Sequence, residues 1–142
     1  MMRMLVVAPL ILLPVLAYAL VAVFSGDSGA DANLQGALFS MPMMSGGRWR
    51  FTLGDFVLLI GLFALFIEIL KAARTRNDAI VNHSLSMLLL LVCVIAFLVV
   101  PGFGTSVFFL LVVMCLLDVI AGPIVSIVAA RRDFGVGEGL GN

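Results

Sequence analysis

Four long apolar runs alternate with shorter polar stretches along the chain. They cover residues 5–24, 53–73, 80–100 and 107–130. A helix that crosses the hydrocarbon core of a bilayer, about 30 Å thick, needs about 20 predominantly apolar residues. Strands are excluded within the runs, because the alternation of a membrane barrel is absent and an isolated strand would leave its backbone unpaired in lipid. The pattern therefore predicts an all-α, polytopic membrane protein, folded as a bundle of four transmembrane helices.

Boundary residues support these assignments. Residues 101–104, with the sequence Pro-Gly-Phe-Gly, break the chain between the third and fourth spans. A connection this short requires those two helices to form a tight antiparallel hairpin. Thr52 and Asp55 have the spacing of a capping box at the start of the second span. Candidate caps of the other two helices are Asn82 or Ser84 for the third span and Thr105 or Ser106 for the fourth.

The segments outside the spans differ in character. Residues 25–52 form one long outer loop, whose second half is apolar and carries Trp49, a residue that favours the membrane interface. We expect that half to lie on the outer bilayer surface as a short interfacial helix. Residues 135–142 are rich in glycine, and we expect them to form a disordered cytoplasmic tail after a single domain of residues 1–134.

Basic residues set the expected orientation, because the cytoplasmic flanks of transmembrane helices carry an excess of lysine and arginine. With four spans, Arg48 and Arg50 fall on one side of the membrane. A larger set of basic residues falls on the other side: Arg3, Lys71, Arg74, Arg76, Arg131 and Arg132. This asymmetry predicts that both termini lie in the cytoplasm.

One alternative concerns the first span. Arg3, the apolar stretch after it and the sequence Ala17-Tyr18-Ala19 have the pattern of a signal peptide with its cleavage site. Cleavage would leave three spans. Against this interpretation, the apolar run continues to Phe24 and prolines interrupt it, so we expect the first helix to be retained.

The amino-acid composition agrees with a membrane protein and limits the classes of partner that we expect. Hydrophobic residues make up 63% of the chain and charged residues 11%, whereas soluble domains have about 45–50% apolar and about 25% charged residues. The formal net charge is +0, so no global field attracts nucleic acid. The expected partners are the lipid bilayer and other membrane protein subunits, or further copies of the chain.

Cys93 and Cys115 lie in apolar runs, without the spacing of a metal or redox motif.

Four segments of the chain carry a family resemblance: His83–Met87, Pro101–Phe109, Leu117–Gly122 and Ala130–Phe134. Over roughly residues 45–136 the chain resembles small bacterial inner-membrane proteins with four predicted transmembrane helices and no known activity. The resemblance implies a bacterial inner-membrane location. It implies no activity, cofactor or site residue.

Few ionisable side chains fall inside the predicted spans. Glu68 and Asp118 are the two clear cases, with His83 near a helix end and Ser86 close by in sequence. A charge at the middle of a span costs about 2.5–3.5 kcal/mol, so such residues normally face other helices or a wet cavity. Counted from the outer helix ends at about 1.5 Å per residue, the four residues can share one level, whereas counting from the cytoplasmic ends places Glu68 and Asp118 at different depths. The sequence thus predicts a candidate intramembrane polar cluster.

Helical spacing puts these polar residues on faces shared with small residues, which let helices approach closely. The faces are Gly61, Ala64, Glu68 and Ala72 in the second span, His83, Ser86, Leu90 and Cys93 in the third, and Cys115, Asp118, Gly122 and Ser126 in the fourth. Gly122 and Pro123 should kink the fourth helix just below Asp118.

Each member of the cluster has a structural and a functional interpretation. Glu68 is expected to pair with Lys71, one turn later. His83 is expected to be a residue of the helix start rather than a ligand. Asp118 is either a buried carboxyl that fixes helix register, with Ser86 as partner, or part of a proton or cation relay.

No residue pattern points to catalysis. The chain has one histidine, no nucleophile–base pair, no cofactor motif and no metal-site spacing, so an enzyme is the least favoured class. We expect an accessory or interaction subunit, or an assembly factor, of a membrane complex. The alternative is a small proton- or cation-coupled transporter that acts as a homo-oligomer through Asp118 and Glu68.

Overall fold

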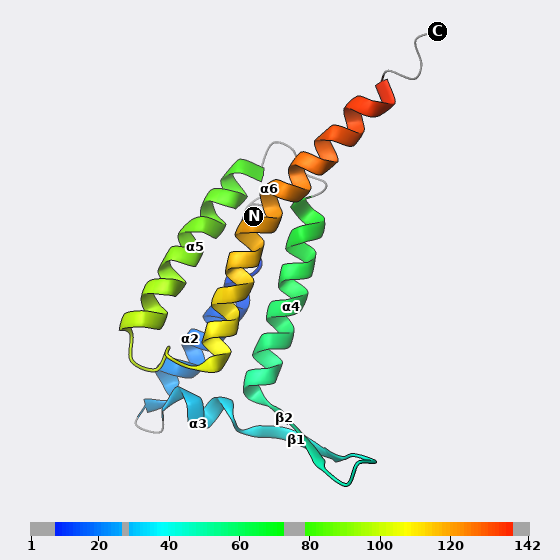
Figure 1. Cartoon of the computed structure of the whole chain (residues 1–142). Helices are drawn as coiled ribbons and strands as arrows, with labels where there is room; N and C mark the ends of the chain where they lie inside the picture. The colour runs from blue at the N-terminus through cyan, green and yellow to red at the C-terminus, as the bar shows by residue number, and fades with distance from the viewer. Residues whose placement is uncertain (1–7, 27–28, 73–78, 138–142) are drawn as a thin grey trace.

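The computed structural model describes residues 8–26, 29–72 and 79–137, and these are mostly helical (Figure 1). Three helices are long and apolar enough to span a membrane. They are α4 (Leu53–Ala72), α5 (Ala79–Val99) and α6 (Ser106–Gly137). Before them come a shorter apolar helix α2 (Leu12–Phe24), a short helix α3 (Ala30–Leu34), and the strands β1 (Ala37–Pro42) and β2 (Arg48–Thr52).

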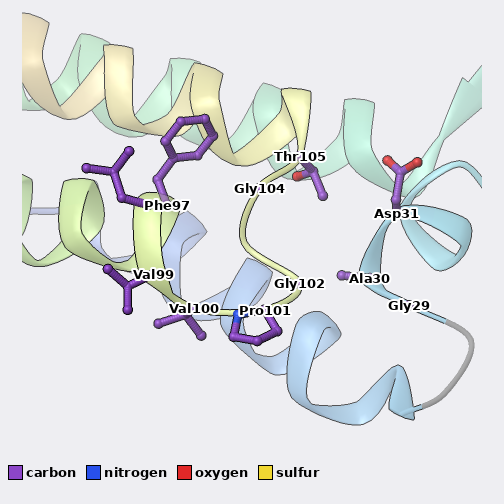
Figure 2. A pocket seen from close by; sticks show the side chains of 11 residues that line it. Gly29, Ala30, Asp31, Phe97, Val99, Val100, Pro101, Gly102, Gly104 and Thr105 are labelled. Atoms are coloured by element: carbon purple, nitrogen blue, oxygen red, sulfur yellow. The ribbon is translucent and has the colours of Figure 1, made fainter.

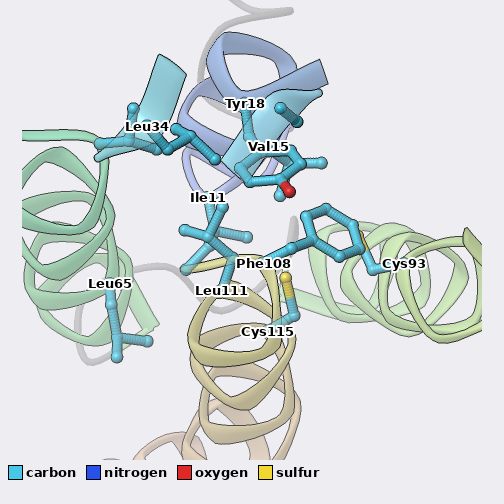
Figure 3. Packing of buried hydrophobic residues seen from close by; sticks show 11 residues of the cluster. Ile11, Val15, Tyr18, Leu34, Leu65, Cys93, Phe108, Leu111 and Cys115 are labelled. Carbon is cyan, nitrogen blue, oxygen red and sulfur yellow. The ribbon is translucent and has the colours of Figure 1, made fainter. Parts of the chain in front are cut away.

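Helix α6 is the centre of the bundle. It packs against α4 on one side and α5 on the other, and α2 lies against α4 and α6 (Figures 1 and 3). The buried core lies where these helices meet, and includes Ile11, Tyr18, Phe108 and Leu111 (Figure 3). Many other large apolar side chains of α4, α5 and α6 are exposed, which is what helices with lipid-facing sides require.

The start of α4 confirms the predicted capping box. The Thr52 amide and hydroxyl donate to Asp55 Oδ2 at 2.9 and 2.8 Å, and the Asp55 amide donates to Thr52 Oγ1 at 3.1 Å. The reciprocal bonds satisfy backbone donors that the first turn of a helix leaves unpaired. They fix the first residue of α4 directly after strand β2.

The connection between α5 and α6 is as short as predicted. Gly102 has a φ of 85° there, a backbone conformation that residues other than glycine rarely adopt. The Phe108 amide donates to Thr105 Oγ1 at 3.2 Å, so Thr105 caps α6. The two helices form an antiparallel hairpin (Figure 1), which confirms the prediction for the third and fourth spans.

Helices α4 and α6 approach closely because glycines stand at their interface. A Cβ on Gly54 would lie 2.8 Å from Val107 Cγ2 and 3.3 Å from the Leu34 carbonyl oxygen, and one on Gly61 would lie 2.9 Å from Met114 Sδ. The spacing of small residues predicted the part of this face that holds Gly61, Ala64 and Glu68, but not Gly54. The buried residues of α4 are Gly54, Val57, Gly61, Ala64, Leu65 and Glu68.

The two glycines should differ in their tolerance of a methyl group. At Gly61 the obstructing atoms are the ends of flexible side chains, which can move. At Gly54 they are a β-branched valine and a backbone oxygen, which cannot move freely. Since overpacking costs about 1–3 kcal/mol, we expect Gly54→Ala to lower the thermal unfolding temperature in mild detergent clearly more than Gly61→Ala. Equal losses would contradict this packing.

The first helix begins later than the predicted span. The Leu12 and Leu13 amides donate to the carbonyls of Pro9 and Leu10 in a turn that precedes α2, whereas the predicted span began at residue 5. Residues 5–7 lie outside the described ranges. Pro14 falls in the first turn of α2, where its missing N–H removes no helical bond. The described helix has 13 residues, and its axis is about 20 Å long.

Tyr18 fastens α2 to the turn between α5 and α6. Its side chain is fully buried, and its hydroxyl donates to the Gly102 carbonyl at 2.8 Å and lies 2.6 Å from Thr105 Oγ1. The ring packs against Phe103 and Phe108. Because the hydroxyl is satisfied, a tyrosine can occupy the buried side of this apolar helix. Helix α2 therefore belongs to the same core as the three longer helices.

The apolar half of the long outer loop is a β-hairpin, so the prediction of a short interfacial helix there was wrong. Strands β1 and β2 pair antiparallel, and Gly46 has a φ of 83° in the turn between them. Phe39, Trp49 and Phe51 pack against one another. Cross-strand aromatic contacts of this kind stabilise a hairpin, and a glycine with positive φ suits its turn. The one helix described within this loop is the five-residue α3.

Helix α6 runs past the residue at which we expected the disordered tail to begin. It continues to Gly137, and residues 138–142 lie outside the described ranges. Glycine costs about 1 kcal/mol relative to alanine in a helix interior, which a long helix tolerates in its last turn. Its 32 residues correspond to about 48 Å, so α6 extends beyond the ends of α4 and α5 (Figure 1). Pro123 lies inside the helix, which bends in its second half (Figure 1).

Candidate functional site

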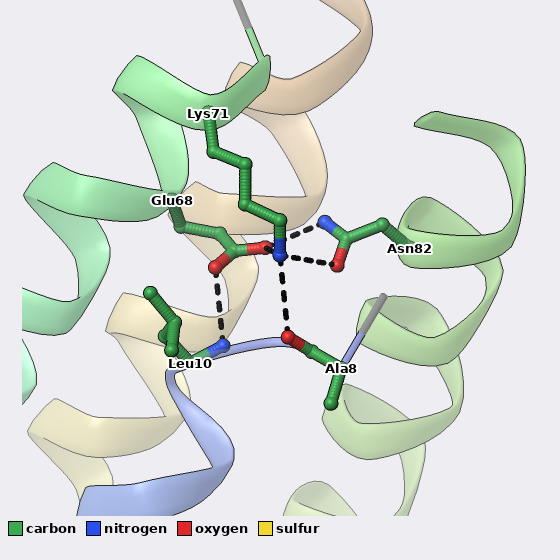
Figure 4. A network of polar contacts seen from close by, with 5 residues as sticks. All are labelled: Ala8, Leu10, Glu68, Lys71 and Asn82. Atoms are coloured by element: carbon green, nitrogen blue, oxygen red, sulfur yellow. Dashed lines mark hydrogen bonds and ion pairs between the residues drawn. The ribbon is translucent and has the colours of Figure 1, made fainter. Parts of the chain in front are cut away.

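Glu68 joins three segments of the chain near the C-terminal end of α4 (Figure 4). Its side chain is 1% exposed. Oε2 accepts a hydrogen bond from the Leu10 amide at 3.1 Å, and Oε1 accepts one from Asn82 Nδ2 at 2.6 Å and lies 3.2 Å from Lys71 Nζ. The segment before α2, helix α4 and helix α5 are thus tied to one carboxylate. We call this group of residues the Glu68 network.

Lys71 completes the Glu68 network. Its ammonium donates to the Ala8 carbonyl and to Asn82 Oδ1, each at 3.3 Å. The predicted pair of Glu68 with Lys71 is confirmed. Asn82 and Ser84 were candidate caps of the third helix, but α5 begins at Ala79, so both lie inside it. Asn82 instead binds α5 to α4.

A row of polar and small residues follows the interface between α5 and α6, and we call it the polar seam. The faces predicted from helical spacing meet here. The seam consists of three facing pairs: His83 with Gly122, Ser86 with Asp118, and Cys93 with Cys115. Both cysteines are free thiols and are buried, in keeping with the small hydrophobic residues that we expected.

Ser86 and Asp118 are buried without a full set of hydrogen bonds. Their side chains are 3% and 5% exposed. Within the described part of the chain, neither Ser86 Oγ nor Asp118 Oδ2 has a hydrogen-bond partner, although the two side chains face each other. A buried polar atom left unsatisfied costs about 1–3 kcal/mol. The Asp118 carboxyl therefore keeps the capacity to bind a proton or a further donor, whereas the Glu68 carboxylate already accepts three.

The members of the candidate cluster divide between these two groups. Glu68 belongs to the network with Lys71 and Asn82, whereas His83, Ser86 and Asp118 lie in the polar seam between α5 and α6. Sequence reasoning missed the contribution of Asn82 and of the backbone before α2. A signal for Asn82 was available, since an amide inside an apolar helix needs a partner as much as a carboxylate does.

An open hollow of about 440 Å³ lies at the opposite end of the bundle (Figure 2). It is formed by the start of α3, the end of α5 and the turn to α6. Among the described residues its lining is mainly glycine and apolar side chains, with Asp31 as the one charged side chain. Small-molecule sites usually combine an apolar cavity with several convergent polar groups. This hollow offers few such groups, so we assign it no ligand.

No metal centre is evident in the three described ranges, since no group of three or more His, Cys, Asp or Glu side chains there is arranged to hold an ion. Comparison of the chain with protein-family models, with curated proteins and with solved structures gives no match. The function must therefore be argued from the chain's own residues.

Proposed function

We propose that the protein is a four-span integral membrane protein of the bacterial inner membrane that serves as an accessory or interaction subunit, or an assembly factor, of a membrane complex. The length and composition of α4, α5 and α6 support the location. Helix α2, together with the apolar residues before it, supplies the first span. The buried Tyr18 supports retention of that span, because cleavage after Ala19 would remove its contacts with the α5–α6 turn.

The observation that carries the interaction role is the one-sided packing of α5. Its main contact is with α6, and among its described side chains only Ser86 and Cys93 are buried. Exposed apolar residues such as Leu88, Leu91 and Ile95 occupy its other sides. A helix of another subunit would complete the packing of α5 by the same close contacts that join helices within membranes.

Site-specific cross-linking combined with purification tests this role. A photoreactive residue in place of Leu91, which is 56% exposed on α5, should capture a second membrane protein in native membranes. The matched control is Phe63, which is 61% exposed on α4 and should capture lipid. Purification in mild detergent followed by mass spectrometry should recover the same partner in a fixed ratio. A lone homodimer, in which Leu91 is captured by a second copy of the same chain, would contradict the accessory role. That result would favour the alternative function, a transporter that acts as a homo-oligomer.

The proposed topology makes its own prediction. Because six basic residues flank one side of the four spans and two the other, reporter fusions after Arg76 and Arg132 should both report the cytoplasm. A fusion after Ala32 should report the outer side. A cytoplasmic signal at Ala32 would contradict the four-span arrangement with both termini in the cytoplasm.

The second candidate function is a proton- or cation-coupled transporter that acts as a homo-oligomer. The unsatisfied Asp118 and Ser86 atoms favour it, because a carboxyl with spare capacity inside an apolar helix is the kind of group that relays a proton. The Glu68 network weakens it, since Glu68 is already occupied by three donors. Asp118 alone would then relay the proton or cation. The variant Asp118→Asn distinguishes the two proposed functions, because it should abolish transport but not an accessory role.

A further inference from the structure

We infer that the β1–β2 hairpin lies flat in the interface of the outer leaflet, with its aromatic face in lipid and its two arginines against lipid phosphates. The inference rests on the proposed four-span topology and is independent of the accessory role. It concerns a surface that the helical bundle leaves open.

The strand register divides the hairpin into two chemically different faces. Residues that pair directly across an antiparallel ladder project to the same side of the sheet. One face holds the pairs Phe39–Phe51 and Met41–Trp49, and the other holds the pairs Ser40–Arg50 and Pro42–Arg48. We call them the aromatic face and the arginine face.

The aromatic face is formed but not covered. Phe39 and Phe51 stack with their ring centroids 4.9 Å apart, and Trp49 meets both rings edge-on at 5.9 and 5.8 Å. Phe39 and Trp49 nevertheless remain 45% and 46% exposed. A two-stranded hairpin is marginally stable in water at best, and an apolar face this open needs a further apolar surface.

The position of the hairpin selects lipid as that surface. Strand β2 ends at Thr52 and α4 begins at Leu53, so no linker separates the hairpin from the helix that enters the membrane. The capping box holds that junction. The hairpin also extends sideways from the end of α4 rather than along the helix axis (Figure 1). Its aromatic side chains therefore lie at the depth where tryptophan is enriched in membrane proteins.

The arginine face fits the headgroup layer. Arg48 and Arg50 stand on the side of the sheet opposite the aromatic rings, and a guanidinium binds phosphate oxygens in a bidentate manner. Interfacial elements bind through buried apolar area combined with attraction to anionic lipid. The hairpin supplies both contributions, one from each face.

Trp49 is the sole tryptophan of the chain, so its fluorescence reports this face alone. In vesicles of phosphatidylcholine with brominated acyl chains, we expect the emission of the full-length protein to be strongly quenched. In unbrominated vesicles we expect a blue-shifted maximum and little quenching by aqueous iodide. Strong iodide quenching without quenching by brominated lipid would overturn the inference, because the face would lie in water. Protection from both quenchers would also overturn it, since a protein surface would then cover Trp49.

A matched control moves the reporter to the other face. The double variant Trp49→Phe with Ser40→Trp keeps both arginines and an aromatic at position 49, and tryptophan is well accepted in strands. We expect this reporter to respond more to iodide and less to brominated lipid than Trp49 does. Equal responses of the two reporters would show that the hairpin has no fixed orientation in the membrane. When anionic lipid is added to the vesicles, we expect a larger blue shift of Trp49 emission in the unmodified protein. The variant Arg48→Gln with Arg50→Gln should lose this additional shift.

Discussion

The variant Glu68→Ala should lose about 3 kcal/mol of unfolding free energy, at the low end of the range for breaking a buried ion pair. The substitution leaves Asn82 Nδ2, the Leu10 amide and the Lys71 ammonium without the carboxylate that they share. The loss falls at the low end because Lys71 is 17% exposed and can extend toward water. Unfolding of the purified protein in mild detergent, followed by circular dichroism, measures the change.

The variant Glu68→Gln is the matched control. It keeps the shape of the side chain and one acceptor oxygen, but its amide group donates and must face one of the former donors. We expect a loss smaller than that of alanine. If Glu68→Ala unfolds at the same temperature as the unmodified protein, the Glu68 network does not hold the three segments together.

The long helices could be predicted because apolar run length is decisive in a membrane. The observed α4 and α5 fall within one or two residues of the predicted spans 53–73 and 80–100, since charged or helix-breaking residues end both runs. The Thr52 cap and the tight α5–α6 turn followed from short motifs whose geometry is local. The first helix was harder to place, because Pro9 precedes a turn that delays its start.

The hairpin was missed because its apolar content was interpreted as a helix face. Alternation was present, since Phe39 and Met41 lie two residues apart in one strand and Trp49 and Phe51 two apart in the other. The sequence Ser45-Gly46-Gly47 between them is a turn signal of the kind that joins two strands. Period-two alternation over so few residues is a weak signal, and the preference for helices inside lipid does not apply outside the spans.

The candidate cluster was predicted from helical spacing, but the partners of its members were not. Spacing placed Ser86 and Asp118 on inward faces, and they face each other across the α5–α6 interface. Spacing within one helix carries no information about a contact that crosses 58 residues, such as that of the Leu10 amide with Glu68. The two carboxyl groups therefore looked alike in the sequence and differ in the structure: Glu68 accepts three hydrogen bonds, whereas Asp118 Oδ2 is buried without a partner among the described residues.

Asp118 should tolerate replacement by a neutral amide but not by a cation. Asparagine has the same shape and can form a hydrogen bond with the facing Ser86 hydroxyl, so we expect Asp118→Asn to fold normally, with a change no larger than the average of about 0.6 kcal/mol for hydrogen bonds within membranes. Lysine at this position would add a longer cationic side chain to a buried interface. We expect Asp118→Lys to lose about 2.5–3.5 kcal/mol, the insertion cost of a charge at mid-helix. Expression level and thermal unfolding in mild detergent measure both variants.

Complementation of a deletion strain distinguishes a structural role of Asp118 from a transport role, once each variant has been shown to fold. As an accessory subunit, the protein needs Asp118 only for the fit between α5 and α6, and Asp118→Asn should complement a deletion strain and recover the same partner. A proton or cation relay cannot work with an amide, because an amide does not titrate. The variant Ser86→Ala removes the facing hydroxyl and leaves a carboxyl that can still titrate, so it serves as the control. A stably folded Asp118→Asn protein that fails to complement, beside a Ser86→Ala protein that succeeds, would make Asp118 a transport residue and overturn the accessory role.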